Sequence, residues 1–244
     1  MPTILVTGSS RGIGIELVRQ YAARNWRVIA TVRKPETADD VTALSRTHSN
    51  IEIERLDVTQ PGQAFALAKR LRGVPIDVLL QNAGIAPGRP EQSRFGTIDF
   101  ALAREVMETN LWPALWIAEA LLENVLRSEQ RKIMVMSSAA GSISGLARSQ
   151  ANNSGGYYLY RMSKASLNMA VALMARDLAP RQVTVGLLSP GQVDTDLGRG
   201  GASSPPPGVI SAEQSVTGLM KVIDEFSLDK SGKFIRYTGL EVPW

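Results

Sequence analysis

The sequence lacks cysteine, and its 244 residues include a single histidine, His48. A chain without cysteine forms no disulfide, offers no thiolate nucleophile and binds no metal through sulfur. His48 lies in a polar stretch where we expect it to be solvated, and a lone imidazole gives little support for a metal site. The absence of cysteine also fits a reducing compartment, which favours a cytoplasmic protein.

Long apolar runs are missing as well. The sequence has no stretch of about 20 apolar residues that could cross a membrane. Its first residues lack the basic start and the apolar core of a secretory signal. We therefore expect no membrane partner.

Neither sign of charge dominates. Lys and Arg together number 27 and Asp and Glu 23, which gives a formal net charge of +4. The basic residues are scattered along the chain, whereas nucleic-acid-binding proteins usually carry a clustered basic footprint. We therefore expect an acidic small molecule as ligand and no nucleic acid as partner.

What the sequence does contain is a repeated alternation of short apolar runs with amphipathic segments. The runs predict strands over residues 4–6, 28–30, 51–53, 78–80, 133–136 and 183–185, and a last strand near 233–235. Apolar residues at helical spacing predict helices between them, among them 13–22, 167–178 and 212–226. Consecutive apolar positions within the strands are typical of parallel strands that are covered on both faces.

This pattern predicts an α/β fold with a single Rossmann-type domain over residues 1–244. Its doubly wound parallel sheet would have about seven strands, with helices on both faces. The Gly- and Pro-rich stretch 198–208 is interpreted as a loop over a site rather than a domain boundary. We expect the substrate loops near residues 139–157 and 194–210.

A glycine-rich turn, TGSSRGIG, joins the first predicted strand to the first predicted helix. Gly8 allows a tight turn, Gly12 lets the backbone approach a pyrophosphate, and Gly14 permits close packing of helix on strand. The N-terminus of the helix then offers N–H groups to the phosphates. A purely structural turn is the alternative. The turn residues predicted to bind a cofactor are Gly8, Ser10, Arg11, Gly12, Ile13 and Gly14.

Further short motifs follow in order along the chain. They are Asn82-Ala83-Gly84 after the fourth strand, Asn110 on a helix, Ser137-Ser138 after the fifth strand, the YxxxK pair Tyr160 and Lys164, and Pro190-Gly191 after the sixth strand. Together with the TGxxxGxG turn, this series resembles the short-chain dehydrogenase/reductase family over nearly the whole chain. The long spacing from Ser138 to Tyr160 and the ending 241–244 are similar to its sniffer-type carbonyl reductase and C-factor-like branch.

The resemblance implies a catalytic group of Asn110, Ser138, Tyr160 and Lys164. Residues four apart on a helix project on one face, so we expect Lys164 beside Tyr160. A nearby ammonium lowers the pKa of a phenol toward the range useful for proton transfer. Ser138 would donate a hydrogen bond to the substrate carbonyl oxygen, and Asn110 would hold a water that links Lys164 to solvent.

Neighbouring side chains offer alternatives for two of these roles. Ser137 competes with Ser138, although strand alternation sends the two to opposite faces and the family pattern favours the second. Tyr157 and Tyr158 stand close to Tyr160, but neither has a lysine four residues further on. We expect these two tyrosines to line the pocket or to pack.

The end of the second predicted strand indicates which nicotinamide cofactor is bound. An acidic residue usually binds the ribose 2′-hydroxyl there, but the first acid in this segment is Glu36. Arg33 stands nearer and, with Arg11, could bind a 2′-phosphate. The predicted cofactor is therefore NADP(H). The alternative is that both arginines are solvated surface cations.

The resemblance implies further cofactor contacts at the ends of other strands. The adenine is assigned to Asp57 and Val58, with a turn-capping role as the plain alternative for Asp57. The adenosine ribose and the nicotinamide carboxamide are assigned to loops after the fourth and sixth strands, at Asn82, Ala83, Gly84, Pro190, Gly191, Val193 and Thr195. Tyr160 and Lys164 complete the cofactor-binding set.

These assignments predict an NADPH-dependent oxidoreductase that reduces a small aldehyde, ketone or quinone to the alcohol, with Tyr160 as general acid. The alternative is a cofactor-binding signalling or regulatory protein of the C-factor type with incidental reductase activity. The apolar helices around Ala114–Ala118 and Ala165–Ala172 resemble the family's dimer surfaces, so we expect a homodimer or homotetramer.

Overall fold

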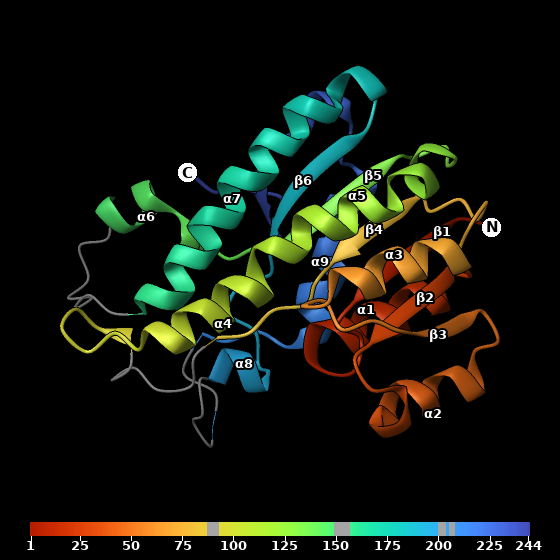
Figure 1. Cartoon of the computed structure of the whole chain (residues 1–244), viewed down its shortest axis with the longest axis horizontal. Coiled ribbons are helices and arrows are strands. Elements are labelled where there is room, and N and C mark those ends of the chain that lie inside the picture. The colour runs from red at the N-terminus through yellow and green to blue at the C-terminus, as the bar shows by residue number, and fades with distance from the viewer. Residues whose placement is uncertain (87–92, 149–156, 200–203, 205–207) are drawn as a thin grey trace.

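The computed structural model describes residues 1–86, 93–148, 157–199, 204 and 208–244. Residues 149–156 of the first predicted substrate loop lie outside the described residues, as do 200–203 and 205–207 of the second. Figure 1 shows the described chain as one central sheet with helices packed against it.

Within the described residues, seven strands form one sheet in the order β3-β2-β1-β4-β5-β6-β7, and every neighbouring pair is parallel. The predicted α/β fold with a doubly wound parallel sheet is therefore confirmed. The strands are β1 (Thr3–Thr7), β2 (Arg27–Val32), β3 (Ile51–Arg55), β4 (Val78–Gln81), β5 (Lys132–Met136), β6 (Thr184–Ser189) and β7 (Phe234–Arg236).

Strand β6 is longer than the predicted 183–185 because Gly186 interrupts its apolar pattern without ending the strand. A Cβ at Gly186 would lie 2.5 Å from the ring of Phe226, so only glycine fits there. Leu187 and Leu188 follow it and are fully buried.

Helices cover both faces of the sheet (Figure 1). One face carries α1 (Gly12–Ala23), α2 (Asp39–Thr47) and α9 (Ala212–Asp224), and the other carries α3 (Pro61–Arg70), α4 (Phe100–Asn110), α5 (Trp112–Leu126) and α7 (Tyr158–Leu178). Two short helices, α6 (Ile143–Arg148) and α8 (Asp196–Arg199), lie in the segments that follow β5 and β6.

Alternation along each strand divides the core into two clusters. Leu5, Ile29 and Leu79 pack with α3, α5 and α7, whereas the adjacent residues Ile4 and Val28 pack with α1, α2 and α9. This division follows from successive side chains of a strand pointing to opposite faces of the sheet. The strands are thus held rigidly from both sides.

The strand order places a crevice beside β1. The chain runs from β1 outward to β2 and β3, and then returns to β4 on the other side of β1. In sheets of this kind, ligands bind outside the carboxyl ends of the strands where the order reverses. The loops after β1 and β4 meet at that point.

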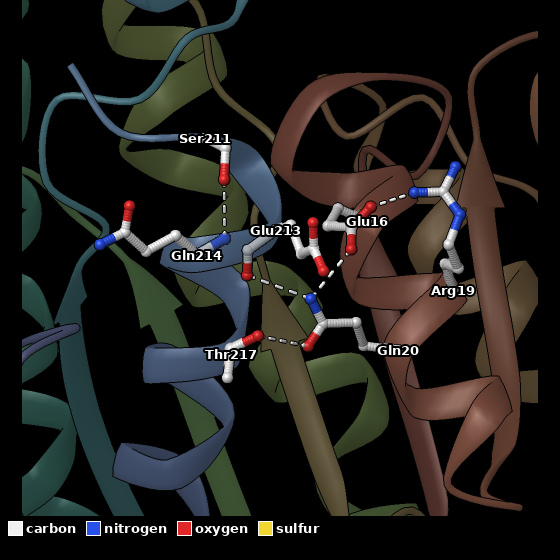
Figure 2. Close-up of polar contacts among 7 residues, drawn as sticks. All are labelled: Glu16, Arg19, Gln20, Ser211, Glu213, Gln214 and Thr217. Atoms are coloured by element: carbon white, nitrogen blue, oxygen red, sulfur yellow. Dashed lines mark hydrogen bonds and ion pairs between the residues drawn. The ribbon is translucent and has the colours of Figure 1, made fainter.

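Helix α1, which begins at the glycine-rich turn, is held to α9 by polar side chains (Figure 2). The Gln20 amide donates to Glu16 Oε1 at 2.9 Å and to the Glu213 carbonyl at 3.1 Å, and its oxygen accepts from the Thr217 hydroxyl at 3.1 Å. Glu16 also pairs with Arg19. These contacts fix the start of α9 against α1.

Candidate active site

A cavity of about 480 Å³ opens at the carboxyl ends of the strands, and most of the predicted site residues line it. It brings together the glycine-rich turn, the end of β2, the segments after β3 and β4, part of α7 and the segment after β6. The predicted residues that line it are Gly8, Ser10, Arg11, Gly12, Ile13, Gly14, Arg33, Asp57, Val58, Asn82, Ala83, Gly84, Tyr160, Lys164, Pro190 and Thr195.

Glycine is required in the turn for two different reasons. Gly8 has a φ of +70°, and a Cβ there would lie 2.9 Å from the Cα of Ala83. Gly14 lies against the start of the same turn, since its Cβ would be 2.0 Å from the Gly8 carbonyl oxygen. Side chains at these positions would push the turn away from the strand ends, so the glycines keep the start of α1 pointed at the cavity.

Asn82 ties the ends of β1 and β4 together. Its side-chain amide donates to the carbonyl groups of Thr7 at 3.2 Å and Gly8 at 3.3 Å. The Thr7 hydroxyl in turn accepts from the main-chain N–H groups of Asn82 at 3.0 Å and Ala83 at 3.1 Å. Asn82 therefore holds the ends of β1 and β4 together at the cavity that it lines.

Arg33 lines the cavity, and its guanidinium is not paired with a described carboxylate. Its side chain is exposed. Glu36, the nearest acid in sequence, pairs instead with Arg55 at 2.7 Å. The end of β2 thus offers a cation and no free carboxylate to a ligand in the cavity.

Arg11 reaches across the mouth of the cavity. Its guanidinium lies 3.3 Å from the Asp196 carboxylate at the start of α8, and both side chains are about 75% exposed. The turn and α8 also approach each other at Gly12, where a Cβ would lie 3.3 Å from Thr195 Cγ2. The sequence analysis did not anticipate Asp196, which lines the cavity with no motif around it.

Asp57 makes the turn contacts that were considered as its plain alternative. Its Oδ1 accepts from the main-chain N–H of Thr59 at 3.0 Å and from the Thr59 hydroxyl at 2.8 Å. Asp57 and Val58 nevertheless line the cavity at the end of β3. A turn-capping role and a ligand-facing position are therefore compatible for Asp57.

Tyr160 and Lys164 project into the cavity from the first turns of α7. The Lys164 ammonium lies 5.8 Å from the centroid of the Tyr160 ring and donates to the Met136 carbonyl at 2.9 Å. Lys164 is almost fully buried, and this burial lowers its pKa to about 8. The helical spacing thus brings the two groups together as expected.

The pKa of Tyr160 differs from the expectation. Burial raises the pKa of its phenol above the usual value near 10, and a hydrogen bond with Ser138 lowers it only in part. The expected dominance of the Lys164 charge is not seen, because loss of solvation outweighs the other contributions. A raised pKa keeps the phenol protonated near neutral pH, which suits a proton donor.

The two serines after β5 have different partners. The buried Ser137 hydroxyl donates to Asn168 Oδ1 on α7 at 2.5 Å. Ser138 is the serine whose interaction lowers the pKa of the Tyr160 phenol, and its Oγ accepts from the Ala140 N–H at 3.2 Å. This arrangement leaves Ser138 as the serine beside the phenol, although Ser137 rather than Ser138 is among the residues lining the cavity.

The Asn110 side chain forms its hydrogen bonds with other residues of the chain. Its Oδ1 accepts from the Ile85 N–H at 2.8 Å, and its Nδ2 donates to the Ile85 carbonyl at 2.8 Å and to the Ser163 hydroxyl at 3.0 Å. Asn110 does not line the main cavity. It holds the segment after β4 against the helix that carries Tyr160.

Helix α4 ends at Asn110 because Pro113 follows. Pro113 has no N–H to donate to the Thr109 carbonyl four residues earlier, and the Ala114 N–H donates to the Leu111 carbonyl at 3.1 Å instead of to the Asn110 carbonyl. The Asn110 main-chain carbonyl is thereby released from its helical partner. That carbonyl, and not the side chain, is the group of Asn110 that could accept a hydrogen bond from a water.

The loop after β6 places Thr195 at the cavity and two of its predicted neighbours behind it. Thr195 Oγ1 accepts from the Gly198 N–H at 3.1 Å and caps α8. Gly191 has a φ of +83° and lies against the Tyr237 ring, and Val193 is buried and forms a bridge with Ile210. Neither Gly191 nor Val193 is among the residues that line the cavity.

Asn168 is a site residue that the sequence analysis missed. It is buried, it accepts from Ser137, and its Nδ2 donates to the Gly141 carbonyl at 3.3 Å. Its position four residues after Lys164, on the same face of α7, was the available signal. Asn168 links α7 to the segment that carries Ser138.

The described residues contain neither a membrane-spanning helix nor a metal-binding cluster. Among the described helices, none is both long enough and apolar enough to span a membrane. In the same part of the chain, no group of three or more His, Asp or Glu side chains is arranged to hold a metal ion.

Comparisons with known proteins agree with the geometry. The family model described as short chain dehydrogenase matches residues 2–203. The chain is 38% identical to the C-signal of Myxococcus xanthus over 170 residues, which are 70% of this chain and 93% of that protein.

Two solved structures are similar over essentially the whole chain. An NADPH-bound carbonyl reductase from chicken fatty liver has a TM-score of 0.89 and 30% identity, covering 100% of this chain and 99% of that one. The carbonyl reductase Sniffer of D. melanogaster has a TM-score of 0.86 and 29% identity, covering 100% of both chains. The resemblance inferred from the motifs is therefore confirmed.

Proposed function

The chain belongs to the short-chain dehydrogenase/reductase family of oxidoreductases, and from this premise we propose that it reduces small carbonyl compounds with NADPH. The substrates would be aldehydes, ketones or quinones, and the products the corresponding alcohols. The observation that carries the proposal is the position of Tyr160 and Lys164 in the same cavity as the glycine-rich turn.

The residues around the cavity fit a dinucleotide with a 2′-phosphate. Gly8 and Gly14 leave a turn whose backbone can approach a pyrophosphate, and the first N–H groups of α1 are directed at it. Arg33 offers a guanidinium that no described carboxylate pairs at the end of β2, and Glu36, the first acid after it in the sequence, is paired with Arg55. Arg11 stands beside the turn as a second cation. This donor set favours NADP(H) over NAD(H).

The proposed reaction needs a hydride and a proton, and the protein manages the proton. NADPH supplies the hydride to the carbonyl carbon when it is bound. Tyr160 donates its phenolic proton to the carbonyl oxygen, while Ser138 donates a hydrogen bond to the same oxygen as negative charge develops. The Lys164 charge stabilises the phenolate left behind. The carbonyl group thereby gains one hydride and one proton and becomes an alcohol.

Lys164 and the Asn110 carbonyl provide a route to reprotonate Tyr160. Lys164 lies beside the phenol, and a Cβ at Gly84 would lie 3.2 Å from Asn110 Oδ1 and 3.7 Å from Lys164 Nζ, so the three residues are close together. The released main-chain carbonyl of Asn110 is a hydrogen-bond acceptor for a water in this region. We place the family's water-linked relay here.

The second candidate function is a signalling or regulatory protein that binds the cofactor and reduces substrate only incidentally. The similarity to the C-signal supports it. The retained group of Ser138, Tyr160 and Lys164 argues against it, because a protein that only senses a cofactor has no need of a proton donor. The cytoplasmic location and the homodimeric or homotetrameric assembly remain predictions.

The test is NADPH oxidation by the purified chain against a panel of aldehydes, ketones and quinones, with Tyr160→Phe measured in parallel. We expect oxidation that depends on the carbonyl compound and falls by about 100-fold or more in the variant. NADPH binding without oxidation for any compound of the panel would favour the signalling function instead.

A further inference from the structure

The two segments that resemble the sniffer-type and C-factor-like branch of the family contact each other directly. They are the long stretch before Tyr160 and the ending 241–244. The Ser142 hydroxyl donates to the Pro243 carbonyl at 2.5 Å. The Ser144 N–H donates to the Trp244 oxygen at 2.7 Å, and the Ser144 hydroxyl donates to the same oxygen. These partners are 100 or 101 positions apart in the sequence, so only the fold brings them together.

The ending is itself anchored to the sheet. Val242 is buried, and its N–H donates to the Phe234 carbonyl on β7 at 2.7 Å. The Trp244 ring packs on the Phe234 ring with centroids 6.2 Å apart. Residues 242–244 are therefore fixed to β7, and we call them the C-terminal support.

Residues 242–244 also contact Ser142, directly before α6. Ser142 is buried, and its Oγ accepts from the Gly145 N–H at 2.9 Å while its hydroxyl donates to Pro243. One serine thus joins the first turn of α6 to the ending. Without the ending, the hydroxyl of Ser142 and the N–H of Ser144 would lose their partners.

The same support continues toward the catalytic group. A single turn of 3-10 helix, Ala139–Gly141, connects Ser138 to Ser142. It packs tightly on α7, since a Cβ at Gly141 would lie 2.7 Å from the main-chain carbon of Lys164. A displacement of Ser142 would therefore be transmitted to Ser138 and to its contact with Tyr160.

The cofactor cavity is built from other parts of the chain. None of the described residues in 139–148 or 240–244 lines it. Its lining comes from the turn after β1, from the ends of β2 to β6 and from parts of α4, α7 and α8, and it includes Ser137 but not Ser138. A change in the ending should consequently leave cofactor binding intact.

We propose that residues 242–244 are a positioning element for segment 138–148, which they hold so that Ser138 keeps its position beside Tyr160. The proposal rests on the proposed reductase function and deepens it. It assigns the ending to catalysis of carbonyl reduction. It assigns it no part in binding NADPH.

The experiment compares two variants that loosen the support with two that do not. Trp244→Ala removes the ring that packs on Phe234, and Ser142→Ala removes the hydrogen bond to Pro243. Trp244→Phe keeps an aromatic anchor and should restore the wild-type behaviour. Leu240→Ala is the matched control, because this side chain belongs to the same segment but is 68% exposed.

Three quantities are measured for each variant: hydrogen exchange of the amides in 142–148, the turnover number with a carbonyl substrate, and the NADPH dissociation constant from cofactor fluorescence. In Trp244→Ala and Ser142→Ala we expect amide exchange at residues 144 and 145 to be about tenfold faster. Turnover should fall about tenfold, because small displacements of catalytic groups are costly. The NADPH dissociation constant should be unchanged, and the control should match the wild type in all three quantities.

Other outcomes separate the inference from the proposed function. Unchanged amide exchange and turnover in both variants would overturn the positioning role. So would faster exchange spread over the whole chain together with weaker NADPH binding, which indicates general loss of stability. If the wild type binds NADPH but reduces no carbonyl compound, the proposed function fails. In that case, faster amide exchange confined to 139–148 in Trp244→Ala and Ser142→Ala would still show that residues 242–244 hold this segment. Unchanged amide exchange would overturn that role.

Discussion

Lys164 lies over the Tyr160 ring, with its ammonium 5.8 Å from the ring centroid and its hydrogen bond directed to the Met136 carbonyl on β5. Lys164 is buried and Tyr160 is partly exposed at the cavity, and desolvation shifts their pKa values in opposite directions. The pKa of the phenol is raised and the pKa of the ammonium is lowered to about 8. At neutral pH the pair is therefore a neutral phenol beside a cation, which is the state that carbonyl reduction requires.

Replacing Tyr160 by Phe should remove the proton donor and leave the cavity otherwise intact. We expect turnover to fall by about 100-fold or more and NADPH affinity to stay nearly the same. Steady-state kinetics and a cofactor-binding titration measure the two quantities. Tyr157→Phe is the matched control, since Tyr157 is half exposed and has no lysine four residues further on. A near-normal rate in Tyr160→Phe would remove Tyr160 from the mechanism.

The pH dependence of reduction should follow Lys164. Below about pH 8 the lysine is protonated and its charge stabilises the phenolate, and as pH rises through this value the charge is lost. We expect the turnover number to fall above about pH 8. Lys164→Arg keeps its charge throughout this range, so its residual activity should lack that decline. A decline that is identical in the variant would show that another group is titrating.

Arg33→Ala should weaken NADPH binding more than NADH binding. A hydrogen bond to a charged group contributes about 1.5–3 kcal/mol, so the NADPH dissociation constant should rise by about 10- to 100-fold. Titrations with both cofactors measure the difference, and Arg46→Ala on the exposed side of α2 is the control. Equal weakening of both cofactors would argue against a contact with the 2′-phosphate.

Asp196→Asn should strengthen NADPH binding. In the present arrangement the Asp196 carboxylate is the partner of Arg11, at 3.3 Å across the cavity mouth. Exposed ion pairs contribute up to about 1 kcal/mol, so the gain should be no more than about fivefold and should shrink at high salt. Asp229→Asn, far from Arg11 in sequence and not among the cavity residues, serves as control. Weaker binding in Asp196→Asn would mean that the carboxylate itself helps to hold the cofactor.

The outer face of α7 should form part of an interface between copies of the chain. Met169 and Leu173 lie on this face and are 63% and 54% exposed. Apolar side chains of this size are costly to leave in water as a patch. We expect sedimentation at micromolar concentration to show a dimer or tetramer, and Leu173→Glu to shift it toward the monomer. A wild-type chain that sediments only as a monomer would contradict the predicted assembly.

Local patterns in the sequence were sufficient for the fold and for the order of the site. Parallel strands buried on both faces produce consecutive apolar residues, so all seven strands could be located from the pattern of apolar runs, although Gly186 concealed the length of β6. The spacing of Tyr160 and Lys164 on one helix likewise determined that they share a face. In each case the relevant neighbours lie within a few positions of one another.

Tertiary structure decided the relationships that join distant segments. The fold gave the two serines their different partners, since Ser137 donates to Asn168 on α7 and Ser138 lies beside Tyr160. Only the fold paired Arg11 with Asp196 and placed Trp244 on Ser144. The raised pKa of Tyr160 has the same origin, because desolvation depends on every element that covers the phenol. The periodicity of the sequence indicates on which face of a helix or strand a residue lies. The partner of that residue and its exposure to water depend on segments that are distant in the sequence.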